Sequence, residues 1–104
     1  MKAIQTDRAP TAIGPYSQAI VHGGLVYCSG QVALSPEGDW RPGTAAEEAR
    51  LALSNLSAVL ESAGARLNTT LKVTVYLIDM SDFAEVNAVY AEFFADHRPA
   101  RACV

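Results

Sequence analysis

The stretch Thr44–Gly64, TAAEEARLALSNLSAVLESAG, decides the fold, because it carries the start, the apolar stripe and the stop of one helix. Thr44 and Glu47 have capping-box spacing, in which hydroxyl and carboxylate satisfy each other's backbone amides. Gly64 supplies the stop. Polar residues, Asn55 among them, lie outside an apolar stripe that is expected to face a sheet. The members of the stripe are Ala49, Ala52, Leu53, Leu56, Val59, Leu60 and Ala63.

Downstream of this helix the pattern changes to alternation. Residues 71–78 predict a strand whose face of Leu71, Val73, Val75 and Leu77 meets the helices. A second helix is expected from Ser81 or Asp82, with Glu85 at capping-box spacing, and it ends at His97–Pro99. Its expected buried residues are Phe83, Val86, Val89, Tyr90 and Phe93. Residues 99–104 open a further strand with Arg101 and Cys103 on one face.

Upstream of the helix, residues 19–21 and 25–29 predict a hairpin around His22-Gly23-Gly24, since glycine supplies the positive φ of tight turns. Residues 35–43 are dense in turn formers. The order hairpin, helix, strand, helix, strand indicates an α+β layered domain. We expect a partly parallel, mixed sheet with two helices packed on one face.

Length and composition limit the number of domains and the classes of function that the chain can have. With 104 residues, 50% of them hydrophobic and 18% charged, the chain has room for one domain, residues 1–104. The net charge of −3 provides no basic field for nucleic acid. Cys28 and Cys103 have no disulfide or zinc spacing, and no apolar run is long enough for a membrane span. A cytoplasmic protein is expected.

Arg101 is the first candidate for a functional residue. It stands in a small, neutral segment, and its planar fork is suited to bidentate binding of a substrate carboxylate. Two other interpretations stay open, an ordinary surface arginine or a structural ion pair with Glu85 or Glu92. Spacing alone does not choose among them.

Other candidates each have a structural alternative. Tyr16 and Ser17 follow the Gly14-Pro15 turn, where a packed tyrosine is the simpler interpretation. Ser29 and Gly30 end the hairpin, and Gly30 permits close approach of a ligand or marks a β-bulge. Asn87 points by default to solvent, and Cys103 is a nucleophile or, without a nearby base, a small buried residue that offers its backbone.

Metal and hydrolase signatures are absent from the sequence. His22 and His97 have no second ligand at metal spacing. No Ser-His-Asp set and no phosphate loop is legible. The two histidines therefore weigh against a metal site.

Several motifs in order resemble the RidA (YjgF-type) family from about Ala12 to the last residue. They are Ile13–Ala19, Ser29–Val32, Asp82-Phe83 with Val86-Asn87, Tyr90 with Phe93-Phe94, and Pro99–Val104. The resemblance implies a chorismate-mutase-like fold and a homotrimer with sites between subunits. It also implies hydrolysis of enamine and imine intermediates, such as 2-aminoacrylate, which pyridoxal-phosphate-dependent dehydratases release, to 2-oxo acids and ammonia. No cofactor takes part.

The resemblance also implies roles for the candidate residues. Arg101 clamps the substrate carboxylate, and the backbone at Cys103 and near Gly30 positions the imine. Tyr16 offers a hydroxyl, while Ser29 and Asn87 shape the cleft. An unshifted phenol titrates near pH 10, so acid–base catalysis by Tyr16 is the weakest of these expectations.

The family normally continues past the Arg-x-Cys-Val segment into a last strand with a water-holding glutamate. We expect such a strand beyond residue 104, because a sheet that ends at Val104 leaves helix surface uncovered. The alternative is a short form of the family without this strand and its glutamate, in which water activation and trimer packing would differ. Two alternatives to the enzyme stay open. The first is a regulatory module that binds metabolites in an arginine-lined cleft between subunits, and the second, disfavoured by the net charge, is a ribonuclease or translation inhibitor.

Overall fold

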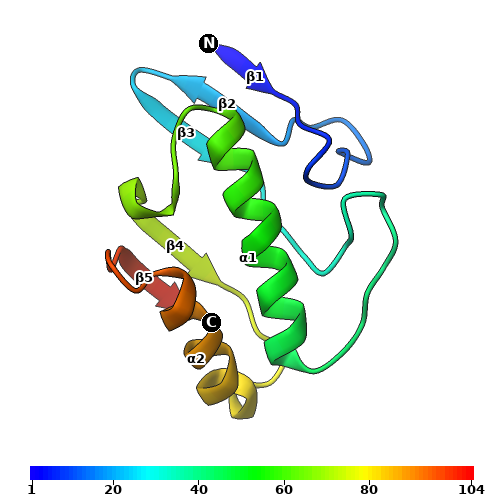
Figure 1. Ribbon diagram of the computed structural model, residues 1–104, viewed down its shortest axis with the longest axis vertical. Coiled ribbons are helices and arrows are strands. Elements are labelled where there is room, and N and C mark those ends of the chain that lie inside the picture. Colours follow the sequence, from blue (N-terminus) through cyan, green and yellow to red (C-terminus); the bar gives the residue numbers. More distant parts are fainter.

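The computed structural model describes residues 1–104, and Figure 1 shows one long helix in front of two small groups of strands. The elements in chain order are β1 (Lys2–Ile4), β2 (Ala19–His22), β3 (Leu25–Cys28), α1 (Ala45–Ser62), η1 (Leu67–Thr69), β4 (Lys72–Val75), η2 (Met80–Asp82), α2 (Phe83–Phe93) and β5 (Ala100–Cys103). The predicted α+β class is confirmed.

The predicted ends of α1 are confirmed. Glu47 N donates to Thr44 Oγ1 at 3.1 Å, and Thr44 N donates to Glu47 Oε1 at 3.0 Å, which completes the capping box. The helix stops at Ser62, and Gly64 has a φ of +82°, the left-handed conformation that favours glycine. Local chemistry therefore sets both ends of α1.

The first sheet has the antiparallel order β1-β2-β3. The predicted hairpin is confirmed: β2 and β3 pair around Gly23 and Gly24, whose φ values are 60° and 78°. Strand β1 was not predicted and pairs antiparallel with β2, with Ala3 opposite Ile20. It covers one edge of the hairpin.

The second sheet is the parallel pair β4-β5, with α2 in the connection between them. The crossover thus confirms the expected parallel pairing, although the strands form two sheets instead of one. The predicted alternation holds for Val73, Val75 and Leu77, which are half-buried, whereas Leu71 is exposed. Leu71 lies just before β4, outside the cover of the helices.

Helix α1 packs on the three-stranded sheet near its C-terminal end and beside α2 near its N-terminal end (Figure 1). The core under α1 consists of small and β-branched side chains, namely Ile4, Ala9, Ala19, Ala58 and Val59. One polar residue on α1 is also buried. Asn55, which the pattern placed outside the apolar stripe, is 1% exposed.

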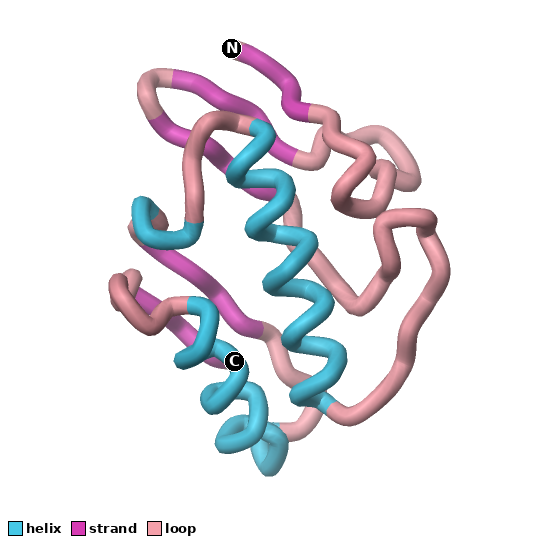
Figure 2. The backbone as a smooth tube through the Cα atoms, in the orientation of Figure 1, coloured by secondary structure: helices cyan, strands magenta, loops and turns pink.

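Asn55 is buried because a loop passes over it. The connection from residue 29 to residue 44 runs along α1 (Figure 2). Asn55 Nδ2 donates to Leu34 O at 2.7 Å and to Val32 O at 3.3 Å. A buried amide with satisfied donors is tolerated inside a protein, so Asn55 fastens the loop that begins at Ser29.

Helix α2 buries Val86, Val89 and Tyr90, as predicted, but Phe94 is buried where Phe93 was expected. Phe94 lies just past the last helical residue and stacks on Tyr90, with ring centroids 4.5 Å apart. The capping role expected for Asp82 is wrong. Asp79 accepts the amide of Ser81 at 2.9 Å instead, because a short 3₁₀ turn precedes α2.

Apolar residues remain exposed on the strand faces turned away from the helices. Leu25 and Tyr27 of β3 are exposed, as are Tyr76 and Ile78 after β4. Contiguous exposed apolar surface on a small protein is typical of an interaction site. None of the helices has the length and apolarity needed to cross a membrane.

Candidate active site

Strand β5 places Arg101 under α2. The strand pairs in parallel with β4, so that Arg101 lies opposite Val73 and Cys103 lies opposite Val75. Residues at alternate positions of a strand share a face. Arg101 and Cys103 therefore share the strand face of Val73, as predicted.

Three residues of α2 hold the Arg101 guanidinium. Nη1 donates to Asn87 Oδ1 at 2.6 Å, and Cζ lies 4.8 Å from the Tyr90 ring centroid and 5.5 Å from that of Phe83. Positions 83, 87 and 90 are four and three residues apart, the spacing of one helix face. Asn87 is half-buried, so the expectation that it points to solvent is wrong.

Arg101 makes no ion pair, which removes the predicted alternative of a structural pair with Glu85 or Glu92. Glu92 instead pairs with Arg50 of α1 at 2.8 Å. The Arg50 guanidinium holds the pKa of Glu92 below its usual value. Arg101 is exposed, and most of its five N–H donors are free to bind an anion.

A cleft of about 590 Å³ opens beside Arg101 between α2 and the start of β5. Two arginines are the only charged residues of its wall, which consists of Asn87, Tyr90, Ala91, Phe94, Ala95, Arg98, Pro99 and Arg101. The hydroxyl of Tyr90 is buried without a hydrogen-bond partner. Burial raises the pKa of Tyr90, and the positive charge of Arg101 acts in the opposite direction.

Tyr16 and Ser29 lie in a second group of residues, around the turn before β2. Gly14 has a φ of +123° and turns the chain, so that Ile13 N donates to Tyr16 Oη at 3.3 Å. Ser29 Oγ donates to Ser17 O at 2.6 Å. Apart from Gly30 itself and its two chain neighbours, no residue has an atom within 4 Å of where a Cβ of Gly30 would stand.

Gln18 fastens this second group to the N-terminal loop. It is 2% exposed, accepts from Thr6 N at 2.8 Å and donates to Pro10 O at 2.8 Å and Thr6 O at 3.1 Å. Gln18 lies within one of the sequence motifs, but no role was predicted for it. A buried amide with this many partners rigidifies its surroundings.

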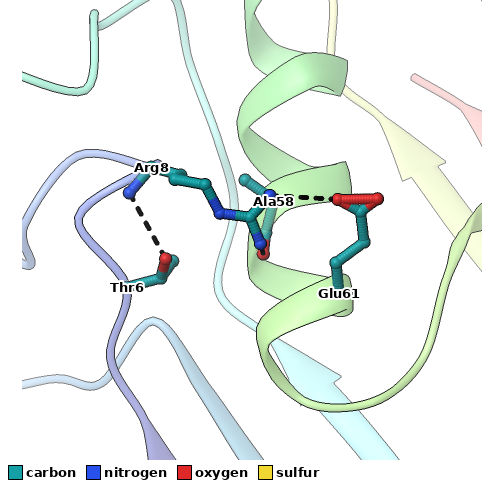
Figure 3. Close-up of polar contacts among 4 residues, drawn as sticks. All are labelled: Thr6, Arg8, Ala58 and Glu61. Atoms are coloured by element: carbon teal, nitrogen blue, oxygen red, sulfur yellow. Dashed lines mark hydrogen bonds and ion pairs between the residues drawn. The ribbon is translucent and has the colours of Figure 1, made fainter.

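Arg8 ties the same loop to α1 (Figure 3). Its Nη1 donates to Glu61 Oε1 at 3.2 Å, and its Nη2 donates to Ala58 O at 3.5 Å. Arg8 N donates to Thr6 Oγ1 at 3.3 Å. The loop is thus held both by the buried Gln18 and by this exposed ion pair.

The predicted site residues form two separate groups within one chain. Asn87, Arg101 and Cys103 lie on α2 and β5, whereas Tyr16, Ser29 and Gly30 lie on the segments that flank the hairpin. No hydrogen bond joins the groups. In Figure 1 the loop before β2 lies at the upper right, whereas strand β5 lies lower and on the other side of α1.

The sequence reasoning also missed part of the arginine site. Phe83 and Tyr90 were predicted as core residues of α2, and Tyr90 is indeed buried, but both rings also contact Arg101. Their spacing with Asn87 on one helix face was visible in the sequence. The missing information was that β5 lies under that face.

Comparison with known proteins gives the chain its family. Residues 6–104 match the family described as Endoribonuclease L-PSP. A 2-iminobutanoate/2-iminopropanoate deaminase of Mus musculus is 49% identical over 102 residues, which cover 97% of this chain and 76% of that protein. The chain belongs to the RidA (YjgF-type) family. The predicted family is confirmed.

Two further RidA-family relatives show how far the likeness extends. A RutC family protein of Pyrococcus abyssi is 46% identical over 104 residues, 99% of this chain and 82% of that protein. The crystal structure of Escherichia coli TdcF with bound serine superposes with a TM-score of 0.94 at 41% identity, over 100% of this chain and 84% of that one. The RidA fold predicted for the chain is therefore confirmed.

Proposed function

We propose that the protein is a 2-iminobutanoate/2-iminopropanoate deaminase of the RidA type, which hydrolyses reactive enamines and imines to 2-oxo acids and ammonia. The proposal rests on the position and the contacts of Arg101. Its guanidinium is fixed by Asn87, Phe83 and Tyr90, has no carboxylate partner and lines an open cleft. A preorganised guanidinium is suited to bind a carboxylate bidentately.

Hydrolysis of an imine requires mainly that the substrate and a water molecule are correctly oriented. The enamine tautomerises to an imine, and water then adds to the C=N carbon while the nitrogen gains a proton. The tetrahedral carbinolamine breaks its C–N bond, releases ammonia and becomes the 2-oxo acid. Holding substrate and water in a reactive geometry lowers such a barrier without a strong nucleophile.

In this proposal Arg101 binds the carboxylate, and the backbone at Cys103 orients the imine from the same strand. Asn87 orients the guanidinium through its hydrogen bond and also forms part of the cleft wall. Tyr16 supplies a hydroxyl to the water or the nitrogen, and Ser29 and Gly30 shape the facing wall. These three residues belong to the group that lies away from Arg101 in one chain.

We therefore propose a cytoplasmic homotrimer in which one subunit supplies the Arg101 group and its neighbour supplies the Tyr16 group. The exposed apolar residues of the strand faces, Tyr27 and Tyr76 among them, support an interface between copies. Light scattering gives the mass in solution, and a monomer would rule out this shared site. Tyr76→Glu is expected to reduce both assembly and activity.

The activity test adds the purified protein to a pyridoxal-phosphate-dependent threonine dehydratase and follows 2-oxobutanoate release. We expect wild type to accelerate release and Arg101→Ala to abolish the acceleration. Arg66→Ala is the matched control, because Arg66 is also exposed and without an ion pair but lies outside the cleft. If wild type does not accelerate the release of 2-oxobutanoate, the proposed deaminase activity is wrong.

A regulatory module that binds metabolites is the second candidate, and the open arginine cleft supports it equally. In the crystal, the TdcF relative has serine bound, which is a ligand with a carboxylate. Calorimetry distinguishes the two functions. Tight binding of 2-oxobutanoate by a protein that produces no acceleration would favour the module over the enzyme.

RNA cleavage is the weakest candidate and is supported only by the description of the matched family and by the names of some similar structures. The net charge of −3 opposes binding to a phosphate backbone. An RNA cleavage assay at physiological salt tests it directly. Cleavage that is lost with Arg101→Ala would move this function ahead of the deaminase.

A further inference from the structure

Arg98 is a second unpaired cation in the cleft of Arg101. It lies between the end of α2 and Pro99, and it lines the cleft together with Arg101. It makes neither an ion pair nor a hydrogen bond with another residue of the chain. Three other arginines, Arg8, Arg41 and Arg50, have a carboxylate partner.

The nearby carboxylates face a different hollow. Glu92 and Asp96 precede Arg98 by a few residues, yet both line the hollow beside His97 and Arg66, and Glu92 is neutralised by Arg50. The wall of the Arg101 cleft contains no Asp or Glu. Two positive charges thus share one cleft in a chain whose net charge is −3. A cleft lined by one sign of charge concentrates ligands of the opposite sign.

One arginine is sufficient for the single carboxylate of 2-aminoacrylate. Arg98 and Arg101 line the same cleft from positions three residues apart in the sequence, so their guanidinium groups can contact different carboxylates of one longer ligand. The cleft of about 590 Å³ has room for more than a three- or four-carbon acid.

We infer that this cleft accepts dicarboxylic imino or oxo acids, with Arg101 on the carboxylate beside the imine carbon and Arg98 on the distal carboxylate. The inference rests on the proposed function of Arg101 and extends it to a substrate class. Arg98 is then a residue that determines specificity, since a monocarboxylate makes no direct contact with it. The imines concerned are those formed from acidic amino acids.

Calorimetry with two probes tests the inference. 2-Oxobutanoate, the product of the proposed reaction, carries one carboxylate, and 2-oxoglutarate, the product expected from the imine of glutamate, carries two. We expect Arg98→Gln to weaken 2-oxoglutarate binding about threefold to fivefold more than it weakens 2-oxobutanoate binding, the size of an exposed ion pair. Arg66→Gln is the control, because Arg66 is also exposed and lies outside the cleft. It should change neither dissociation constant.

The failures are distinguishable. If Arg101→Gln abolishes binding of both probes but Arg98→Gln does not selectively weaken 2-oxoglutarate, the dicarboxylate inference is wrong and the proposed function of Arg101 stands. If wild type binds neither probe, the dicarboxylate inference is wrong, whereas the proposed deaminase activity is decided separately by the acceleration of 2-oxobutanoate release. Arg98 is exposed, so the variant is expected to fold, and circular dichroism checks this before each titration.

Discussion

The guanidinium carbon of Arg101 lies 4.8 Å from the ring centroid of Tyr90, which makes a residue of the hydrophobic core the support of the candidate anion site. Tyr90 is 9% exposed and also stacks on Phe94. A cation over an aromatic face is stabilised by about 0.5–2 kcal/mol, more as water is excluded. The packing of α2 and the orientation of Arg101 are therefore linked.

Tyr90→Leu is expected to raise the KM for the imine, because the guanidinium loses its aromatic support while the reacting groups stay in place. Steady-state kinetics should show a larger change in KM than in kcat. Val89→Ala is the control, since Val89 is also buried on α2 but neither lines the cleft nor contacts Arg101. Equal changes in KM for both variants would mean that general destabilisation explains the effect.

Tyr90→Phe tests the hydroxyl separately from the ring. The Tyr90 Oη atom is buried without a partner, a situation that costs about 1–3 kcal/mol. The phenylalanine variant should keep its activity and gain up to about 1 kcal/mol of stability in urea unfolding. A loss of activity would instead indicate that the hydroxyl acts on the substrate.

Asn87→Asp is expected to impair binding more than Asn87→Ala. The aspartate would form an ion pair with Arg101 where the amide oxygen now accepts a hydrogen bond at 2.6 Å. It would neutralise the guanidinium and compete with the substrate carboxylate. The dissociation constant of 2-oxobutanoate measured for both variants checks the order, and the reverse order would argue against a carboxylate site at Arg101.

Gln18→Ala should destabilise the fold by about 2–4 kcal/mol, because it leaves the buried amide and carbonyl groups of the N-terminal loop without partners. Chemical denaturation measures this free energy. Gln5→Ala, at an exposed position, is the control and should stay within about 0.5 kcal/mol of wild type. Similar midpoints for the two variants would contradict the anchoring role of Gln18.

The capping box of α1 predicts a pH dependence of stability. Backbone and side-chain hydrogen bonds from Thr44 hold the pKa of Glu47 below its ordinary value of 4.5. The carboxylate form is therefore favoured in the folded state. Its contribution is complete above pH 4.5 and is lost as the pH falls through the lower folded pKa.

Glu47→Gln should reduce the slope of stability against pH below about 5, which thermal unfolding over a pH series measures. The control is Glu37→Gln in the exposed loop before α1, a residue without a side-chain hydrogen bond or an ion pair. An unchanged slope in the Glu47 variant would show that the cap does not contribute to acid stability.

Much of the fold was predictable because its signals are local. The reciprocal bonds of Thr44 and Glu47 join residues three positions apart, and the two glycines of the hairpin turn are adjacent. The burial of two polar residues was not predicted, because their partners are distant in the sequence. Asn55 is buried because it bonds to Leu34, 21 residues away, and Gln18 because it bonds to Thr6, 12 residues away.

The sequence by itself determined the helix ends, the hairpin, the family and the choice of Arg101, since periodicity, caps and ordered motifs are written along the chain. Only the tertiary structure decided what surrounds Arg101. The parallel pairing of β5 with β4 brings it under Phe83, Asn87 and Tyr90 and away from Tyr16. The physical reason is that the environment of a side chain depends on which strand and helix pack together, which sequence spacing does not encode.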